Sequence, residues 1–133
     1  MLQSHAQRAA ANLYSKVGVQ GRVESANNHR LILMLMQGVI DRVAAAKGAM
    51  QNKDISAKGQ AISKALAIID GLKGCLNMDL PPEQGGDISE NLQGLYLYME
   101  KRLFKANLEN STELLEEVSQ LMTSLKSAWE EIG

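Results

Sequence analysis

The sequence predicts an all-α protein that folds as an antiparallel four-helix bundle with an additional short N-terminal helix or cap. Apolar residues recur at three- and four-residue steps along four long segments, which is the spacing of one helix face. Hydrophobic residues make up 45% of the 133 residues but aromatic residues only 4%, so the core must consist of Leu, Ile, Val, Ala and Met, which suit helices. Four helices of about 20 residues, each about 30 Å long, form a bundle when short turns join them.

The N-terminal segment is expected to form a short amphipathic helix of its own. One side of residues 1–17 carries Leu2, Ala6, Ala9, Leu13 and Val17. Gly18 and Gly21 follow, and glycines so close together predict a linker. We therefore expect a single domain over residues 1–133, in which residues 1–26 are a cap segment and linker and residues 27–132 form the bundle.

The first long helix is predicted to begin at Asn27, a residue type favoured as an N-cap. Its core-facing stripe consists of Ile32, Met36, Val39, Val43, Ala46 and Met50. Residues 31–36 are apolar all round, which predicts that this part of the helix is fully buried or covered by something else. The helix is expected to end near Gln51–Asn52, before a turn.

The second long helix, residues 56–77, is predicted to have Ser56 as its cap. It carries two apolar stripes, which are Ile62, Leu66, Ile69, Leu72 and Leu76, and Ala61, Ala65, Ile68 and Cys75. Residues 77–86 break the pattern, because Pro81–Pro82 cannot continue a helix and Gly85–Gly86 favours a turn.

The third long helix, residues 87–108, is predicted to be the central helix of the bundle. Asp87 and Glu90 have the spacing of an acidic capping box. Two sets follow at helical spacing. The first is Ile88, Leu92, Leu95, Met99, Arg102 or Leu103, and Ala106, and the second, which is apolar, is Tyr96, Leu97, Leu103, Phe104 and Leu108. A stripe this wide predicts more than one neighbour, and a wall of a partner-binding groove is the open alternative to core packing alone.

The last helix is predicted to be capped by Asn110 or Ser111. Its apolar face consists of Leu114, Val118, Leu121, Leu125, Ala128 and Ile132. Trp129 stands near its end, where we expect it to clamp the bundle rather than to bind a ligand.

Composition excludes several function classes. A net charge of −1 provides no basic excess for a phosphate backbone, so no nucleic-acid partner is expected. The longest apolar run, residues 31–36, is too short to cross a bilayer, and the N-terminus lacks the continuous apolar core of a signal peptide. Cys75 is the single cysteine, so no disulfide forms within the chain. We expect a cytoplasmic protein without membrane insertion.

The sequence also lacks a constellation for catalysis. The two histidines, His5 and His29, belong to no Glu-x-x-His motif of the kind that bundles use to hold two metal ions. Cys75 has no histidine near it in the sequence, and no glycine-rich phosphate loop is present. We therefore expect neither an enzyme nor a bound metal or other cofactor.

Apolar surface is the remaining functional feature. Three of the four long helices carry more apolar residues than one core-facing stripe needs, and the chain contains seven methionines. Methionine fills irregular cores, but it also lines adaptable grooves that accept helices from partners. A groove is therefore a candidate for the excess apolar surface.

Four stretches of the chain resemble the flagellin-specific export chaperone family (FliS). They are HRLILMLMQGVIDRVAAAKGAM, DISAKGQAISKALAIIDGLKGCLNMDL, GGDISENLQGLYLYMEKRLFKANLEN and LLEEVSQLMTSLKSAWEEI. The resemblance covers about residues 14–132, and its most specific parts are the run from Asn91 to Met99 and the terminal Ala128–Trp129. In two places the chain departs from the family pattern: Asn27–Asn28 replace the usual Ser-Pro, and Gln37 replaces an acidic residue before Gly38.

The resemblance implies a helical bundle that acts as a cytoplasmic chaperone of type III protein export in flagellum biogenesis. Such a chaperone binds the disordered C-terminal segment of flagellin, prevents premature polymerisation and delivers flagellin to the export gate. Its further partners are the export-gate protein FlhA and, in some bacteria, an anti-sigma factor. Tyr14 matches an N-terminal aromatic residue that the family associates with the gate or with capping the empty groove.

Flagellin binding of this kind requires apolar grooves on the bundle. We expect the partner-binding residues to be Tyr14 and Asn91, from the resemblance, and, from the apolar stripes, Leu33, Met34, Ile40, Leu66, Ile69, Leu95 and Tyr96. The competing interpretation is a self-associating structural or regulatory bundle that uses the same stripes. Both a monomer and a weak homodimer are compatible with the sequence.

Overall fold

The computed structural model describes residues 21–79 and 81–132, and every element in them is helical. The elements are α2 (Gly21–Gln51), α3 (Ile55–Gly74), the short 3₁₀ helix η1 (Pro82–Gln84), α4 (Gly86–Glu109) and α5 (Thr112–Glu131). The predicted all-helical class with four long helices is thereby confirmed for these residues. The N-terminal helix predicted over residues 1–17, with Tyr14, lies outside the described residues.

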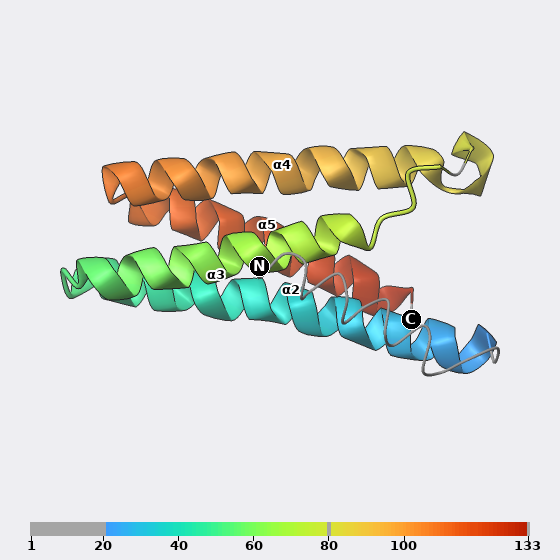
Figure 1. The fold of residues 1–133 in the computed structure, drawn as a ribbon, viewed down its shortest axis with the longest axis horizontal. Coiled ribbons are helices and arrows are strands. Elements are labelled where there is room, and N and C mark those ends of the chain that lie inside the picture. The colour runs from blue at the N-terminus through green and yellow to red at the C-terminus, as the bar shows by residue number, and fades with distance from the viewer. Residues whose placement is uncertain (1–20, 80, 133) are drawn as a thin grey trace.

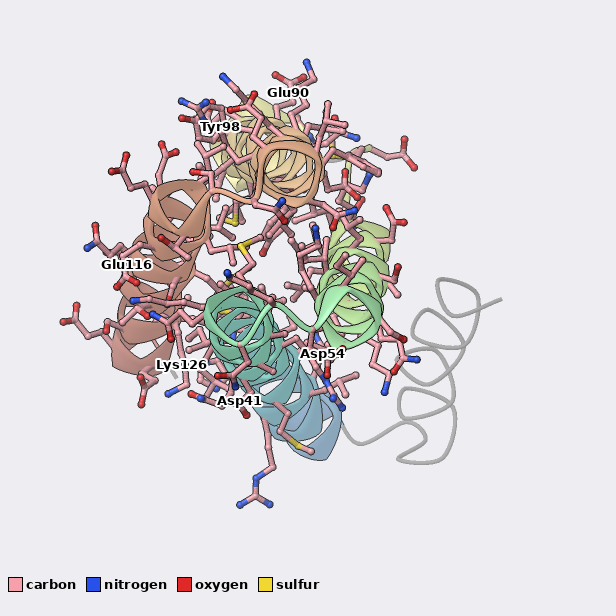
Figure 2. All side chains as sticks on the ribbon, turned by 90° about the vertical axis from the view of Figure 1, so that its left-hand side faces the viewer. Asp41, Asp54, Glu90, Tyr98, Glu116 and Lys126 are labelled. Atoms are coloured by element: carbon pink, nitrogen blue, oxygen red, sulfur yellow. The ribbon has the colours of Figure 1, made fainter. Side chains whose placement is uncertain are left out.

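The four long helices form a ring in which each packs against two others. α2 contacts α3 and α5, and α4 contacts the same two helices from the opposite side. Consecutive helices run in opposite directions along the long axis of the molecule (Figure 1). Seen along that axis, the labelled Asp41, Glu90 and Glu116 lie at the periphery (Figure 2), so charged side chains surround an apolar interior.

The core is built from the stripes that the sequence predicts on the first three helices and from one face of α5. Its least exposed large side chains are Met36, Ile69, Leu72, Met99, Leu103, Leu115, Met122, Val39 and Val118. Three of these are methionines, one from each of α2, α4 and α5. Methionine therefore does the space-filling work that aromatic residues do in other cores.

α2 begins earlier than predicted. The cap predicted at Asn27 is wrong, because the helix already starts at Gly21 and crosses the expected boundary between linker and bundle. Glycine and asparagine each cost about 1 kcal/mol or less inside a helix, and extending an existing helix adds one hydrogen bond per residue. The division of a single domain into a cap segment and a bundle stays a prediction.

α3 and α4 begin at other residues than the predicted caps. Asp54, not Ser56, caps α3, because the Asp54 carboxylate accepts a hydrogen bond of 3.0 Å from the Ala57 amide. At α4 the predicted capping box of Asp87 is absent, and Gly85 is the N-cap with a left-handed φ of 99°. Only glycine adopts that conformation without strain, so the backbone of Gly85 decides where the helix starts. The Asp87 carboxylate instead accepts from the next amide, that of Ile88.

α5 is capped as predicted but turned about its axis. The Ser111 hydroxyl accepts a hydrogen bond of 3.2 Å from the Leu114 amide, whereas Asn110 ends α4 in a left-handed conformation. Leu115 and Met122 are fully buried, although the predicted stripe omitted them, and the predicted Ile132 is 70% exposed. Adjacent apolar residues at 114–115 and 121–122 allow two registers of the stripe. Packing against the other helices selects the register in which Leu115 and Met122 face the core.

Candidate functional site

An apolar pocket opens at one end of the bundle, where α3 ends and α4 begins (right-hand end of Figure 1). Its volume is about 350 Å³. All four long helices and the segment after α3 contribute to its lining, which consists of Ile32, Met36, Leu72, Cys75, Leu76, Asn77, Ile88, Ser89, Leu92, Tyr96, Leu125, Ala128, Trp129 and Ile132. We call this cavity the end pocket.

The path of the chain explains why a cavity forms here. At the opposite end, turns of a few residues join α2 to α3 and α4 to α5. At the pocket end, α3 stops at Gly74 and α4 starts only at Gly86, with η1 between them. The Pro81 carbonyl accepts hydrogen bonds from the Gln84 and Gly86 amides, at 2.9 and 3.1 Å, so the connection turns on itself. The ends of α3 and α4 are thus joined by an excursion rather than by a tight turn.

A reciprocal contact between α2 and α5 closes one wall of the end pocket. Trp129 Nε1 donates to the His29 carbonyl at 3.1 Å, and His29 Nε2 lies 2.6 Å from the Trp129 carbonyl, to which it donates in the matching tautomer. The two rings stack, with centroids 5.2 Å apart and an interplanar angle of 12°. The predicted clamp at Trp129 is confirmed, and its indole is also part of the pocket lining.

The end pocket presents an uncharged surface. None of its lining residues is an Asp, Glu, Lys, Arg or His. Burial raises the pKa of the Cys75 thiol, and burial together with the nearby Cys75 raises the pKa of Tyr96 to about 12. Both groups are therefore neutral near pH 7, and the pocket suits apolar side chains better than an ion.

The residues predicted to bind a partner do not converge on this pocket. Of the nine, Tyr96 alone lines it, and Tyr14 lies outside the described residues. Ile69 and Tyr96 are almost completely buried in the core, whereas Met34 is 63% exposed. The other five are half-buried or exposed around the bundle, namely Leu33, Ile40, Leu66, Asn91 and Leu95. Their role in partner binding stays a prediction.

Several residues that line the pocket were predicted to belong to core-facing stripes, but the structure places them around a cavity. Ile88, Leu92 and Leu125 continue core-facing stripes, and the structure shows that these stripes reach a cavity at the helix ends. The sequence feature that could have indicated a cavity is the proximity of these residues to the predicted helix break at residues 77–86. Stripe positions beside a long break have no tight turn to bring the opposing helix close.

Residues 21–79 and 81–132 contain neither a metal-binding cluster nor a membrane-spanning helix. No group of three or more His, Cys, Asp or Glu side chains there is placed to hold a metal ion. None of the helices in the same residues combines the length and the hydropathy needed to cross a bilayer.

Comparisons with known proteins place the chain in a family. Residues 10–133 match the family model described as flagellar protein FliS. The chain is 46% identical to the flagellar secretion chaperone FliSB of Pseudomonas aeruginosa, over 93% of this chain and 95% of the relative. It is 39% identical to FliS of Vibrio cholerae, over 94% and 89% of the two chains, and 42% identical to FliS of Salmonella typhimurium, over 90% and 87%. The chain therefore belongs to the FliS family of flagellar secretion chaperones.

Proposed function

We propose that this chain is a cytoplasmic export chaperone that binds the disordered C-terminal segment of flagellin. In this role it prevents premature polymerisation and delivers flagellin to the type III export gate. The observation that carries the proposal is the end pocket, which is apolar, uncharged and lined by all four long helices. A family whose members are flagellar secretion chaperones requires a client, and flagellin is the client that the sequence resemblance implies.

The chemistry of the end pocket suits a client that folds when it binds. An unfolded segment contributes apolar side chains at helical spacing, and the pocket removes them from water. Ordering such a segment costs about 2–5 kcal/mol or more, and the free energy gained by burying its apolar side chains must exceed this cost. The complex is therefore specific but releasable, and neither a nucleotide nor a metal enters the binding step. FlhA and, in some bacteria, an anti-sigma factor are the further partners that we include in the proposal.

The first experiment is a calorimetric titration of the full chain with a peptide spanning the flagellin C-terminus. We expect a one-to-one complex, a negative heat-capacity change and a gain of helical circular dichroism. The absence of binding by a folded chain would contradict the proposal. In that case, a tight dimer in sedimentation velocity would favour the self-associating adaptor.

A matched pair of variants locates the binding site. Ile88→Glu places a carboxylate at the end pocket, and the side chain replaced is already 60% exposed. Ile55→Glu makes the same replacement in the first turn of α3, at the opposite end of the bundle, where the side chain is 77% exposed. Both variants should keep the unfolding midpoint. We expect Ile88→Glu alone to weaken peptide binding by about tenfold or more, and equal effects of both would exclude the end pocket.

A further inference from the structure

A second apolar surface runs along the outer side of α4. Leu97, Phe104 and Leu108 are 42%, 62% and 83% exposed, and their spacing of seven and four residues places them on one helix face. That face is opposite to the core-facing Met99 and Leu103. It extends over three helical turns, about 16 Å. In Figure 1, α4 forms the upper edge of the bundle, and no other described element covers its outer side.

Cationic side chains lie within this surface. Lys101 and Lys105 are exposed and occupy the turns between Leu97 and Leu108. Neither lysine takes part in an ion pair within the described residues. We call the surface formed by these two lysines and the three apolar residues the α4 strip.

The acidic groups near the α4 strip are engaged elsewhere or lie at its margin, where Glu109 follows Leu108 at the C-terminal end of α4, four residues after Lys105. Glu100 is bonded to Lys73 of α3 at 2.8 Å, and Glu117 of α5 accepts from Tyr98 and Arg102. Glu90 stands on the same face of α4 but seven residues before Leu97. Between residues 97 and 108 the strip is therefore apolar with a positive local charge.

We propose that the α4 strip docks an amphipathic helix whose apolar face is flanked by acidic residues, supplied by a protein partner. The apolar stripe of such a helix would cover Phe104 and Leu108, and its carboxylates would face Lys101 and Lys105. The strip and the end pocket share no lining residue, so the strip is a separate surface from the one assigned to the client. The partner is thus additional to the flagellin segment of the proposed function.

Charge and area argue against a second copy of this chain as the occupant. A symmetric dimer brings the same patch of both subunits together, which would gather four lysine ammonium groups near the two-fold axis. Three partly exposed side chains also offer only a few hundred Å² of apolar surface. A stable dimer buries about 800 Å² on each partner. An acidic helix supplies opposite charge at the same positions and forms a weaker, transient contact.

The test uses the full chain and two designed helical peptides of about 14 residues, enough to span the strip. Both have the same leucine stripe; glutamates flank it in one and lysines in the other. We expect the native chain to bind the glutamate peptide at least about tenfold more tightly, with an affinity that falls as salt rises. Equal affinity for the two peptides, or no binding of either, would overturn the proposal.

Variants separate the strip from other surfaces. Phe104→Ser should abolish glutamate-peptide binding, whereas the control Ile55→Ser, at a 77% exposed residue of α3, should leave it unchanged. Joint replacement Lys101→Glu and Lys105→Glu should reverse the preference toward the lysine peptide. Unchanged binding in both strip variants would overturn the proposal, as would self-association that Phe104→Ser removes. Ile88→Glu should lower the affinity for the flagellin peptide only. If it also lowers the affinity for the glutamate peptide, both ligands use the end pocket and the proposal for the α4 strip is overturned.

Discussion

Replacing Trp129 by phenylalanine should loosen the contact that joins α2 to α5. The variant keeps a ring that stacks on His29 but loses the indole N–H, which donates to the His29 carbonyl at 3.1 Å. A hydrogen bond of this kind contributes about 0.5–1.5 kcal/mol to stability, and the smaller ring buries somewhat less apolar area. We expect the free energy of unfolding to fall by about 1–2 kcal/mol.

Urea unfolding followed by circular dichroism measures this change. For a chain of this size, such a loss corresponds to a midpoint lower by about 0.5–1 M, with an unchanged slope. A double-mutant cycle with His29→Ala isolates the coupling between the two residues, since His29 also contacts the Trp129 carbonyl at 2.6 Å. We expect a coupling energy of about 1 kcal/mol. Additive effects of the two replacements would refute the idea that the residues act as one clamp.

Two further perturbations test the backbone and the core. Gly48 lies within α2, and no atom is close to the position that a side chain would occupy there, so Gly48→Ala should raise the free energy of unfolding by about 0.5–1 kcal/mol in urea unfolding. Gly85→Ala, at a φ of 99°, should lower it by a similar amount. No gain from Gly48→Ala would show that α2 is frayed at this position. The pKa of Tyr96 is raised to about 12, so the folded state holds its proton more tightly than the unfolded state, and the native chain should lose stability between about pH 10 and pH 12 as pH rises. Tyr96→Phe removes this group, and its midpoint should fall less over the same interval; parallel pH profiles would show that the hydroxyl ionises as freely in the fold as in the unfolded chain.

The sequence predicted the part of the fold that depends on local periodicity. The α2 stripe from Ile32 to Ala46 is buried as expected, because its steps of three and four residues leave one face available to the core. The caps were less predictable, because several suitable residues stand close together. Asp54 and Ser56 both have capping side chains, and the turn that ends α2 decides between them.

The candidate site depends on features that periodicity does not contain. Leu92 and Leu103 belong to the same predicted stripe of α4, yet Leu92 lines the end pocket and Leu103 is completely buried. Leu92 lies near the end of the bundle where the long connection at residues 75–85 joins α3 to α4, whereas Leu103 lies toward the end where turns of a few residues join the helices. A helical period identifies the face of a residue but carries no information about how close the opposing helix comes.

The end pocket and the clamp share Trp129, which links stability to binding. The indole lines the pocket, and its N–H donates to the His29 carbonyl of α2. α5 ends at Glu131, two residues beyond Trp129, and helix ends open locally at a lower free-energy cost than helix centres. The clamp therefore holds a wall that would otherwise fray. A client whose side chains pack against the indole adds contacts to this wall, so binding should stabilise the last turn of α5 more than the centre of the bundle.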